Sequence, residues 1–252
     1  MEQWQPLPHV YTDTLWSKSM FMLRRILDLQ VATVYGHLKK ALSGKERDIL
    51  EVGAGARPYR HLVSKEARYR SLDWEGSKEH FHYDLPDTVY YDGGRFPFED
   101  KAFDLLFHTE VMEHVFDVKL FLSECHRVLR SGSKMFLTVP FNARYHYVPH
   151  DYWRFTPSCL DRLLQAAGFE DIQVVPRGND VAVAVVKVNT LFYKIIFTSV
   201  PAPLGIAWRS FWGLLFCIPV GILTLIGHAS MSMGFASMDD PLGYSVHCRK
   251  KI

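Results

Sequence analysis

The sequence at residues 48–57, DILEVGAGAR, constrains the fold more than any other part of the chain. Its first five residues are a short apolar run ending near an acid, which is typical of a strand buried on both faces of a parallel sheet. Gly53 and Gly55 follow at once, and glycine lets the backbone turn sharply and approach a ligand closely. Together with Glu51, these glycines predict a nucleotide-like ligand over the carboxyl end of the strand.

The segments on either side alternate between strand and helix patterns. Strands are expected at residues 48–52, 68–73, 81–83, 103–108, 134–139 and 172–175, and helices at 15–42, from 59 to 63, at 118–129 and at 157–167. Such alternation predicts an α/β fold, with a mainly parallel sheet covered by helices on both faces.

The bulk composition narrows the function classes. A net charge of +2, carried by scattered basic residues, gives no reason to expect nucleic-acid binding. The four cysteines are far apart and form no C-x-x-C pair, which favours a reduced, cytosolic environment without a cysteine zinc site. The first apolar stretch is interrupted by Lys18, Arg24 and Arg25, so no cleavable signal peptide is expected.

Acidic residues follow the next strands in order. Asp73 ends the second strand, where its carboxylate could accept hydrogen bonds from both ribose hydroxyls of a ligand. Asp92 lies in the loop after the third strand and could meet an adenine amino group, and Glu110 follows the fourth strand. Taken singly, such glycines are often plain turns and such acids are usually solvated. Their joint order along the chain favours one ligand site at the carboxyl edge of the sheet.

Several segments make a family resemblance specific. These are ILEVGAGARPYRHLV, YRSLDWEG, FPFEDKAFDLLFHTEVMEHV, FLSECHRVLRSGSKMFLTVPF and HDYWRFTPSCLDRLLQAAGF. Residues from about 45 to 170 thereby resemble the class I S-adenosylmethionine-dependent methyltransferases, in the small-molecule group called type 11.

The resemblance implies a seven-stranded, Rossmann-like sheet whose last strand is antiparallel, and residues 241–251 look like that strand. It also implies S-adenosyl-L-methionine as cofactor, held by Glu51, Gly53, Gly55, Asp73 and Asp92, with Glu110 beside the sulfur end. Where the family often has a third glycine, this chain has Arg57. A dinucleotide fingerprint fits worse, because its third glycine would fall at Pro58.

Two histidines just after the fifth predicted strand are the candidate catalytic residues. Methyl transfer depends mainly on positioning, and a general base helps if the acceptor is a hydroxyl. His150 is the first candidate and His146 the second, with Tyr152 or Trp153 shaping the acceptor pocket. The alternative is that His150 and its neighbours only organise a loop before the helix at 157.

The H-x-x-x-H spacing of His146 and His150 could also indicate metal ligation. The residues between them are typical of extended structure, which argues against a helical zinc pair. The sequence therefore predicts no metal.

An apolar insertion separates the sixth strand from the last one. We expect a helical cap at residues 1–44, the cofactor-binding core at 45–178, an apolar helical hairpin at 179–238 and the last strand at 239–252. The hairpin would comprise helices at 180–200 and 204–228, separated by Pro201-Ala202-Pro203. Three arrangements are open: a hairpin dipping into one leaflet, which we favour, a full two-helix span, and a buried lid or dimer element.

Together these features predict a methyltransferase with a lipophilic or lipid-linked acceptor, methylated at a hydroxyl. It would contact the cytoplasmic face of a membrane through residues 190–228, or be cytoplasmic if the insertion is buried, and a homodimer is possible. The alternative from another class is a non-catalytic, methyltransferase-like membrane scaffold or partner subunit, for which Arg57 is the main argument.

Overall fold

The computed structural model describes residues 14–80, 84–197 and 204–252. Its centre is a seven-stranded sheet with the order β3-β2-β1-β4-β5-β7-β6, in which β7 is antiparallel to both of its neighbours and the other pairs are parallel. The strands are β1 (Asp48–Val52), β2 (Arg68–Trp74), β3 (Thr88–Tyr91), β4 (Phe103–Thr109), β5 (Leu129–Pro140), β6 (Phe169–Arg177) and β7 (Gly243–Lys250). The predicted fold class is confirmed, including the antiparallel last strand.

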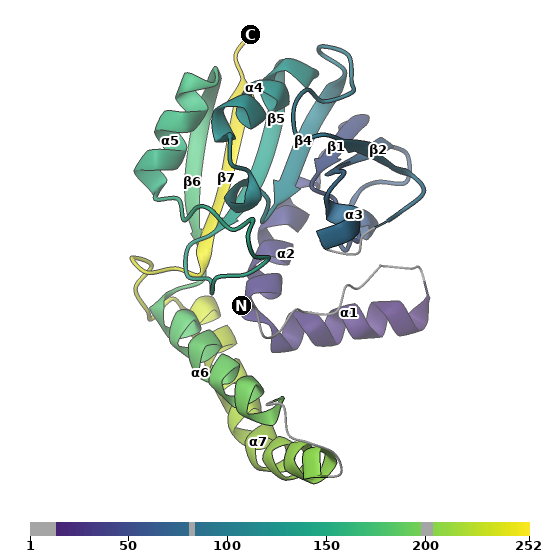
Figure 1. Ribbon diagram of the computed structural model, residues 1–252. Coiled ribbons are helices and arrows are strands. Elements are labelled where there is room, and N and C mark those ends of the chain that lie inside the picture. Colours follow the sequence, from purple (N-terminus) through teal and green to yellow (C-terminus); the bar gives the residue numbers. More distant parts are fainter. Residues whose placement is uncertain (1–13, 81–83, 198–203) are drawn as a thin grey trace.

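Helices cover both faces of this sheet (Figure 1). They are α1 (Leu15–Leu27), α2 (Leu29–Ala41), α3 (Ser77–His80), α4 (Val118–Val128), α5 (Pro157–Ala166), α6 (Asp180–Ile196) and α7 (Leu204–Met233), with short 3-10 turns η1 (Arg60–Leu62) and η2 (Met112–His114). The apolar sides of α4 and α5 pack into one core cluster and those of α1 and α2 into another, on opposite sides of the strands.

Two of the expected helices differ from the prediction. The expected helix at 15–42 is two helices, because Asp28 adopts an extended conformation (φ −113°, ψ 103°) and its side chain caps α2 by accepting from the Gln30 amide at 3.0 Å. Capping by aspartate competes with helix continuation, which a periodicity of apolar residues does not reveal. The expected helix from 59 to 63 is only the turn η1.

Two strands also differ. Residues 81–83, expected as a strand, lie outside the described residues, and the strand beside β2 is β3, whose Thr88 pairs with Ser71. Strand β5 begins directly after α4 rather than at 134, because Leu129 pairs with Phe103 of β4. Both differences depend on pairing with a distant strand.

The insertion leaves and re-enters the sheet at one place. Arg177 ends β6 and is paired in register with Gly243, which begins β7. Between them α6 and α7 form a hairpin that extends away from this end of the sheet (Figure 1). The buried Asn189 side chain of α6 donates to the Thr224 hydroxyl of α7 at 3.1 Å. The hairpin therefore starts at the same edge at which the parallel strands end.

Asn179 fixes the start of this hairpin and supplies a test of the fold. Its buried side-chain oxygen accepts from the Ala182 amide at 2.9 Å and from the Ser230 hydroxyl at 3.1 Å. We expect Asn179→Ala to lower the free energy of unfolding by about 1–2 kcal/mol, because a helix cap and a buried hydrogen bond are both lost. Urea denaturation measures this, and Thr156→Ala, at the exposed cap of α5, serves as control. An Asn179→Ala loss no larger than the control's would contradict this account of the hairpin.

Candidate functional site

A cavity of about 630 Å³ opens at the carboxyl ends of β1, β2 and β4. Its volume lies in the range of pockets that bind drug-sized ligands, about 300–1,000 Å³. Its wall includes the glycine turn after β1, the end of β2 and the start of the loop after β4. Of the sequence-predicted site residues, those lining it are Glu51, Gly53, Gly55, Asp73, Glu110, His150 and Tyr152.

The turn after β1 needs its glycines. Gly53 and Gly55 have φ angles of +65° and +49°, in the left-handed region that favours glycine. A Cβ atom on Gly53 would lie 2.4 Å from a methyl group of Val111. Arg57 has a φ of +51°, which is the backbone conformation that a third glycine would adopt easily. Arg57 is not among the residues that line the cavity, so its side chain does not narrow it.

Asp73 lies where the sequence predicted a ribose contact. Its Oδ2 accepts from the Gly55 amide at 2.8 Å and its Oδ1 from the Trp74 amide at 2.7 Å. These bonds connect β2 to the glycine turn. Because each carboxylate oxygen can accept two hydrogen bonds, Asp73 can also accept from ligand hydroxyls. Burial raises the pKa of Asp73 to about 6.

Glu51, on β1, is the most deeply buried of the acidic side chains that line the cavity. The hydroxyl of Tyr69, on the neighbouring β2, donates to its Oε2. Burial raises the pKa of Glu51 to about 7, although the Tyr69 hydrogen bond opposes the shift. Near neutral pH, this carboxyl group is thus poised between its neutral and charged forms.

Glu110 is held by a partner that the sequence analysis missed. Arg177, which is fully buried, donates from Nη2 to Glu110 Oε1 at 2.7 Å and from Nη1 to the Thr33 hydroxyl at 3.0 Å. The Thr138 hydroxyl donates to the same Glu110 oxygen at 2.8 Å. Arg177 thus joins β6 and α2 to the cavity wall. A single arginine at the end of a strand carries no sequence signal for this role.

The loop after β5 brings His150 and Tyr152 to the cavity. His150 Nδ1 lies 3.1 Å from the Tyr152 hydroxyl, and its ring contacts the rings of Trp74 and His80, with centroids 5.0 and 4.8 Å away. Burial and the neighbouring His80 lower the pKa of His150. A histidine with a lowered pKa is neutral at pH 7 and can accept a proton.

The other three predicted site residues do not line the cavity. His146 Nδ1 lies 2.8 Å from the Arg144 carbonyl and 3.1 Å from Asp151 Oδ2. Trp153 Nε1 donates to the Val115 carbonyl at 3.0 Å. Asp92 accepts from the Gly94 amide at 2.8 Å within its own loop, although Gly93 beside it does reach the cavity. The structure therefore favours His150 over His146 as the candidate base.

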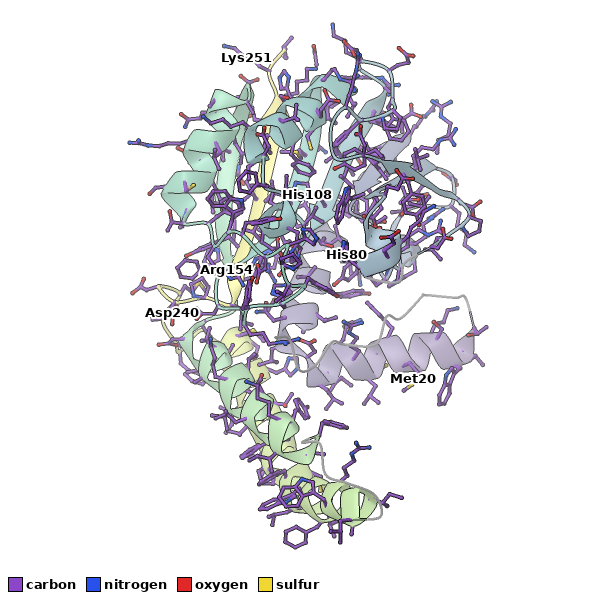
Figure 2. The ribbon with its side chains drawn as sticks, in the orientation of Figure 1. Met20, His80, His108, Arg154, Asp240 and Lys251 are labelled. Carbon is purple, nitrogen blue, oxygen red and sulfur yellow. The ribbon has the colours of Figure 1, made fainter. Side chains whose placement is uncertain are left out.

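Helices α1 and α2 close the cavity from outside the sheet. Arg24 of α1 contributes to its wall, as do Gln30, Val31 and Val34 of α2. Figure 2 shows His80 and Arg154 near the end of the sheet that faces these helices, and Lys251 at the opposite end. The sequence predicted a helical cap at residues 1–44, and the structure places these four side chains of α1 and α2 in the cavity wall.

Comparison with known proteins agrees with this geometry. Residues 50–137 match the family described as "Methyltransferase domain". A probable S-adenosylmethionine-dependent methyltransferase of Mycolicibacterium smegmatis is 30% identical over 147 residues, which are 54% of this chain and 56% of that protein. The match thus spans little more than half of this relative.

Solved structures of low sequence identity share the fold. An S-adenosylmethionine-dependent methyltransferase from Archaeoglobus fulgidus is similar with a TM-score of 0.52 at 14% identity, covering 92% of this chain and 99% of that one. Phosphoethanolamine N-methyltransferase 2 of Haemonchus contortus, in complex with S-adenosyl-L-methionine, has a TM-score of 0.50 at 14% identity and covers 98% of this chain and 61% of that one.

Glu51 supplies a test of the electrostatics of the cavity. The pKa of Glu51 is raised from 4.5 to about 7. Between these pH values the folded protein therefore keeps a proton that the unfolded chain loses. As the pH rises from 4.5 through 7, the Glu51 carboxyl group thus destabilises the folded state progressively. The Glu51→Gln variant lacks this titrating group. We therefore expect the difference in unfolding free energy between the variant and the wild type to rise, in favour of the variant, by about 2–3 kcal/mol from about pH 5 to about pH 8. Urea titrations of both proteins at the two pH values measure this, and a difference that does not change with pH would contradict it.

Proposed function

We propose that this chain, whose residues 50–137 match the methyltransferase domain family, transfers a methyl group from S-adenosylmethionine to a lipophilic acceptor at a membrane surface. The observation that carries the proposal is the cavity at the carboxyl edge of the sheet, which brings Gly53, Gly55 and Asp73 together. Class I topology and a ligand-sized cavity at this edge are what a nucleoside-containing cofactor requires.

The residues of the cavity fit that cofactor. Asp73 would accept hydrogen bonds from its ribose hydroxyls, and the turn at Gly53 would let the backbone approach it closely. Glu51 and Glu110 offer acidic groups for its cationic part, and Asp92 remains a prediction for the adenine amino group. When bound, S-adenosylmethionine supplies an electrophilic methyl group on a positively charged sulfur.

His150 would act on the acceptor. It lines the cavity, its lowered pKa keeps the ring neutral at pH 7, and the Tyr152 hydroxyl 3.1 Å away can orient it. A neutral imidazole at this position would take the proton from an acceptor hydroxyl as the methyl group is transferred. The acceptor is thus proposed to be methylated on oxygen.

The membrane part of the proposal depends on the hairpin. Helix α7 is long and apolar enough to cross a membrane by length and composition, and only 17% of its most apolar window is buried. A core helix of a water-soluble domain would be mostly covered. The large apolar side chains that α7 exposes are Leu204, Ile206, Phe211, Leu214, Leu215, Ile218, Ile222, Leu225, Ile226 and Met233. Since β7 must rejoin the sheet at Gly243, we propose that the hairpin enters one leaflet and returns on the same side.

Helix α1 would extend the same membrane-facing surface. His228 of α7 lies with Nε2 2.9 Å from the carbonyl oxygen of Ile26, so α1 ends against the hairpin. Large apolar side chains on α1 are also exposed: Leu15, Trp16, Met22, Leu23, Ile26 and Leu27. Arg24 of the same helix lines the cavity. An acceptor held in the leaflet would thus meet the cavity beside α1, which favours a lipophilic molecule or a lipid-linked headgroup.

Calorimetric titration of the detergent-solubilised protein with S-adenosylmethionine and S-adenosylhomocysteine tests the cofactor. We expect Asp73→Ala to weaken binding by about 10- to 100-fold, since hydrogen bonds to a charged group contribute roughly 1.5–3 kcal/mol. The affinity of the wild-type protein for the cofactor should also fall as the pH is lowered through 6, because Asp73 takes up a proton there.

Two controls accompany this titration. Asp87→Ala, at an exposed position before β3, should bind like the wild type, and His150→Ala should keep its cofactor affinity because it is proposed to act on the acceptor. A folded wild-type protein that binds neither compound would overturn the enzyme proposal and favour the scaffold.

Flotation with vesicles of phosphatidylcholine and phosphatidylglycerol tests the membrane contact. Leu214 and Ile218 of α7 are 79% and 67% exposed. We expect the double substitution Leu214→Glu and Ile218→Glu to reduce the vesicle-bound fraction at least about tenfold, because two apolar side chains of roughly 1.5–3 kcal/mol each leave the leaflet. Leu120→Glu, at an exposed position on α4, is the matched control. Equal vesicle binding by all three proteins would mean that the hairpin contacts protein rather than lipid.

A further inference from the structure

Three side chains beside the cavity gather their donor atoms in one place. Glu113 and His114 come from the turn η2, and His146 comes from the loop after β5. One carboxylate oxygen of Glu113 and one ring nitrogen of each histidine all lie within 4.8 Å of one another. Segments more than thirty residues apart along the chain thus converge on a cluster that the methyl-transfer chemistry described above does not use.

Glu113 is the member of the cluster that most needs a partner. Its side chain is fully buried, and neither carboxylate oxygen has a hydrogen bond in the part of the chain that the structure describes. Burying a carboxyl group without a partner costs free energy unless a proton or a cation compensates it. The nearby cation Arg154 is already bound to Asp151, with N–O distances of 2.6 and 2.8 Å.

Both histidines are oriented in the way that metal ligands usually are. His114 Nδ1 lies 2.7 Å from the carbonyl oxygen of His150, so Nδ1 carries the proton and Nε2 the lone pair. That Nε2 lies 3.7 Å from Glu113 Oε1. His146 Nδ1 is likewise 2.8 Å from the Arg144 carbonyl and 3.1 Å from Asp151 Oδ2. Hydrogen bonds from the second ring nitrogen to carbonyls or carboxylates fix the tautomer and orientation of metal-binding histidines.

We propose that Glu113, His114 and His146 bind a divalent transition metal, with Zn²⁺ as the best match. Two imidazoles and one carboxylate are a ligand set of catalytic zinc sites, whereas Mg²⁺ and Ca²⁺ prefer oxygen ligands throughout. In a tetrahedral site with ligand bonds of about 2.1 Å, the donor atoms lie roughly 3.4 Å apart. The donor atoms of the three side chains already lie within 4.8 Å of one another, so small side-chain rotations would bring them into contact with one ion.

The site would differ from the H-x-x-x-H pair considered in the sequence. His150 is not part of the cluster, since its ring packs against Trp74 and His80. His114, by contrast, belongs both to the cluster and to the cavity wall. Three protein ligands leave a coordination position for water or a substrate oxygen. If the proposed methyltransferase function holds, that position would bind an oxygen of the acceptor.

The test uses the full chain in detergent, stripped with a chelator, dialysed and titrated with ZnCl₂ in a calorimeter. We expect one Zn²⁺ per chain, with binding weakened at least about tenfold in Glu113→Gln and in His146→Ala because each removes one ligand. A parallel titration with Co²⁺ should give the visible absorption of a low-symmetry, four- or five-coordinate site in the wild type, but not in Glu113→Gln or His146→Ala. His247→Ala, on β7 and outside the cluster, should behave like the wild type.

The outcomes separate this proposal from the methyltransferase proposal. No stoichiometric binding, or binding that both variants retain, would overturn the metal site. Far-ultraviolet circular dichroism and S-adenosylhomocysteine affinity of the metal-free variants report whether each is folded. If the buried Glu113→Gln does not fold, the half-buried His146→Ala decides the question. If the chain binds zinc but does not bind S-adenosylhomocysteine, the metal site would be supported and the proposed function contradicted.

Discussion

The arrangement of the whole molecule depends on the position of β7, which runs antiparallel between β5 and β6. A strand inserted in this direction must begin where β6 ends, so the apolar hairpin has to leave and return at the carboxyl edge of the sheet. This edge also holds the cavity, since β1, β2 and β4 end there. The strand order therefore places the base of the hairpin at the same end of the sheet as the cavity, and α1 lies at this end too (Figure 1).

Arg177 connects the base of the hairpin to the cavity wall. It is buried where the hairpin begins, and it donates to Glu110, to Thr33 and to the carbonyl oxygens of Val139 and Tyr244. Burying an ion pair costs desolvation free energy, and removing one partner costs more because the other charge stays buried alone. The pair is thus better understood as fixing one geometry, in which Arg177 connects Glu110 of the cavity wall to the base of the hairpin.

What the sequence could predict was largely local. The strand and glycine turn at 48–57 and Asp73 at the end of β2 follow from short patterns, whereas the antiparallel last strand follows from the family resemblance. The structure shows all three. The single helix expected at 15–42 was wrong because Asp28 caps a second helix. Arg177 and the cluster around Glu113 could not be predicted, because their partners lie on other segments and no spacing along the chain marks them. The position of β3 depends on its pairing with β2, and the periodicity of apolar residues along the chain does not reveal which strands pair.

We propose that the cavity and the hairpin serve one reaction, in which a lipophilic acceptor is methylated. The most direct test is to incubate the protein with S-adenosylmethionine labelled in the methyl group and a total membrane lipid extract, and to follow the label into the organic phase. We expect label in a lipid-soluble product, and much less of it with Asp73→Ala or His150→Ala. Label found only in water-soluble products, or no transfer by a protein that binds the cofactor, would contradict it.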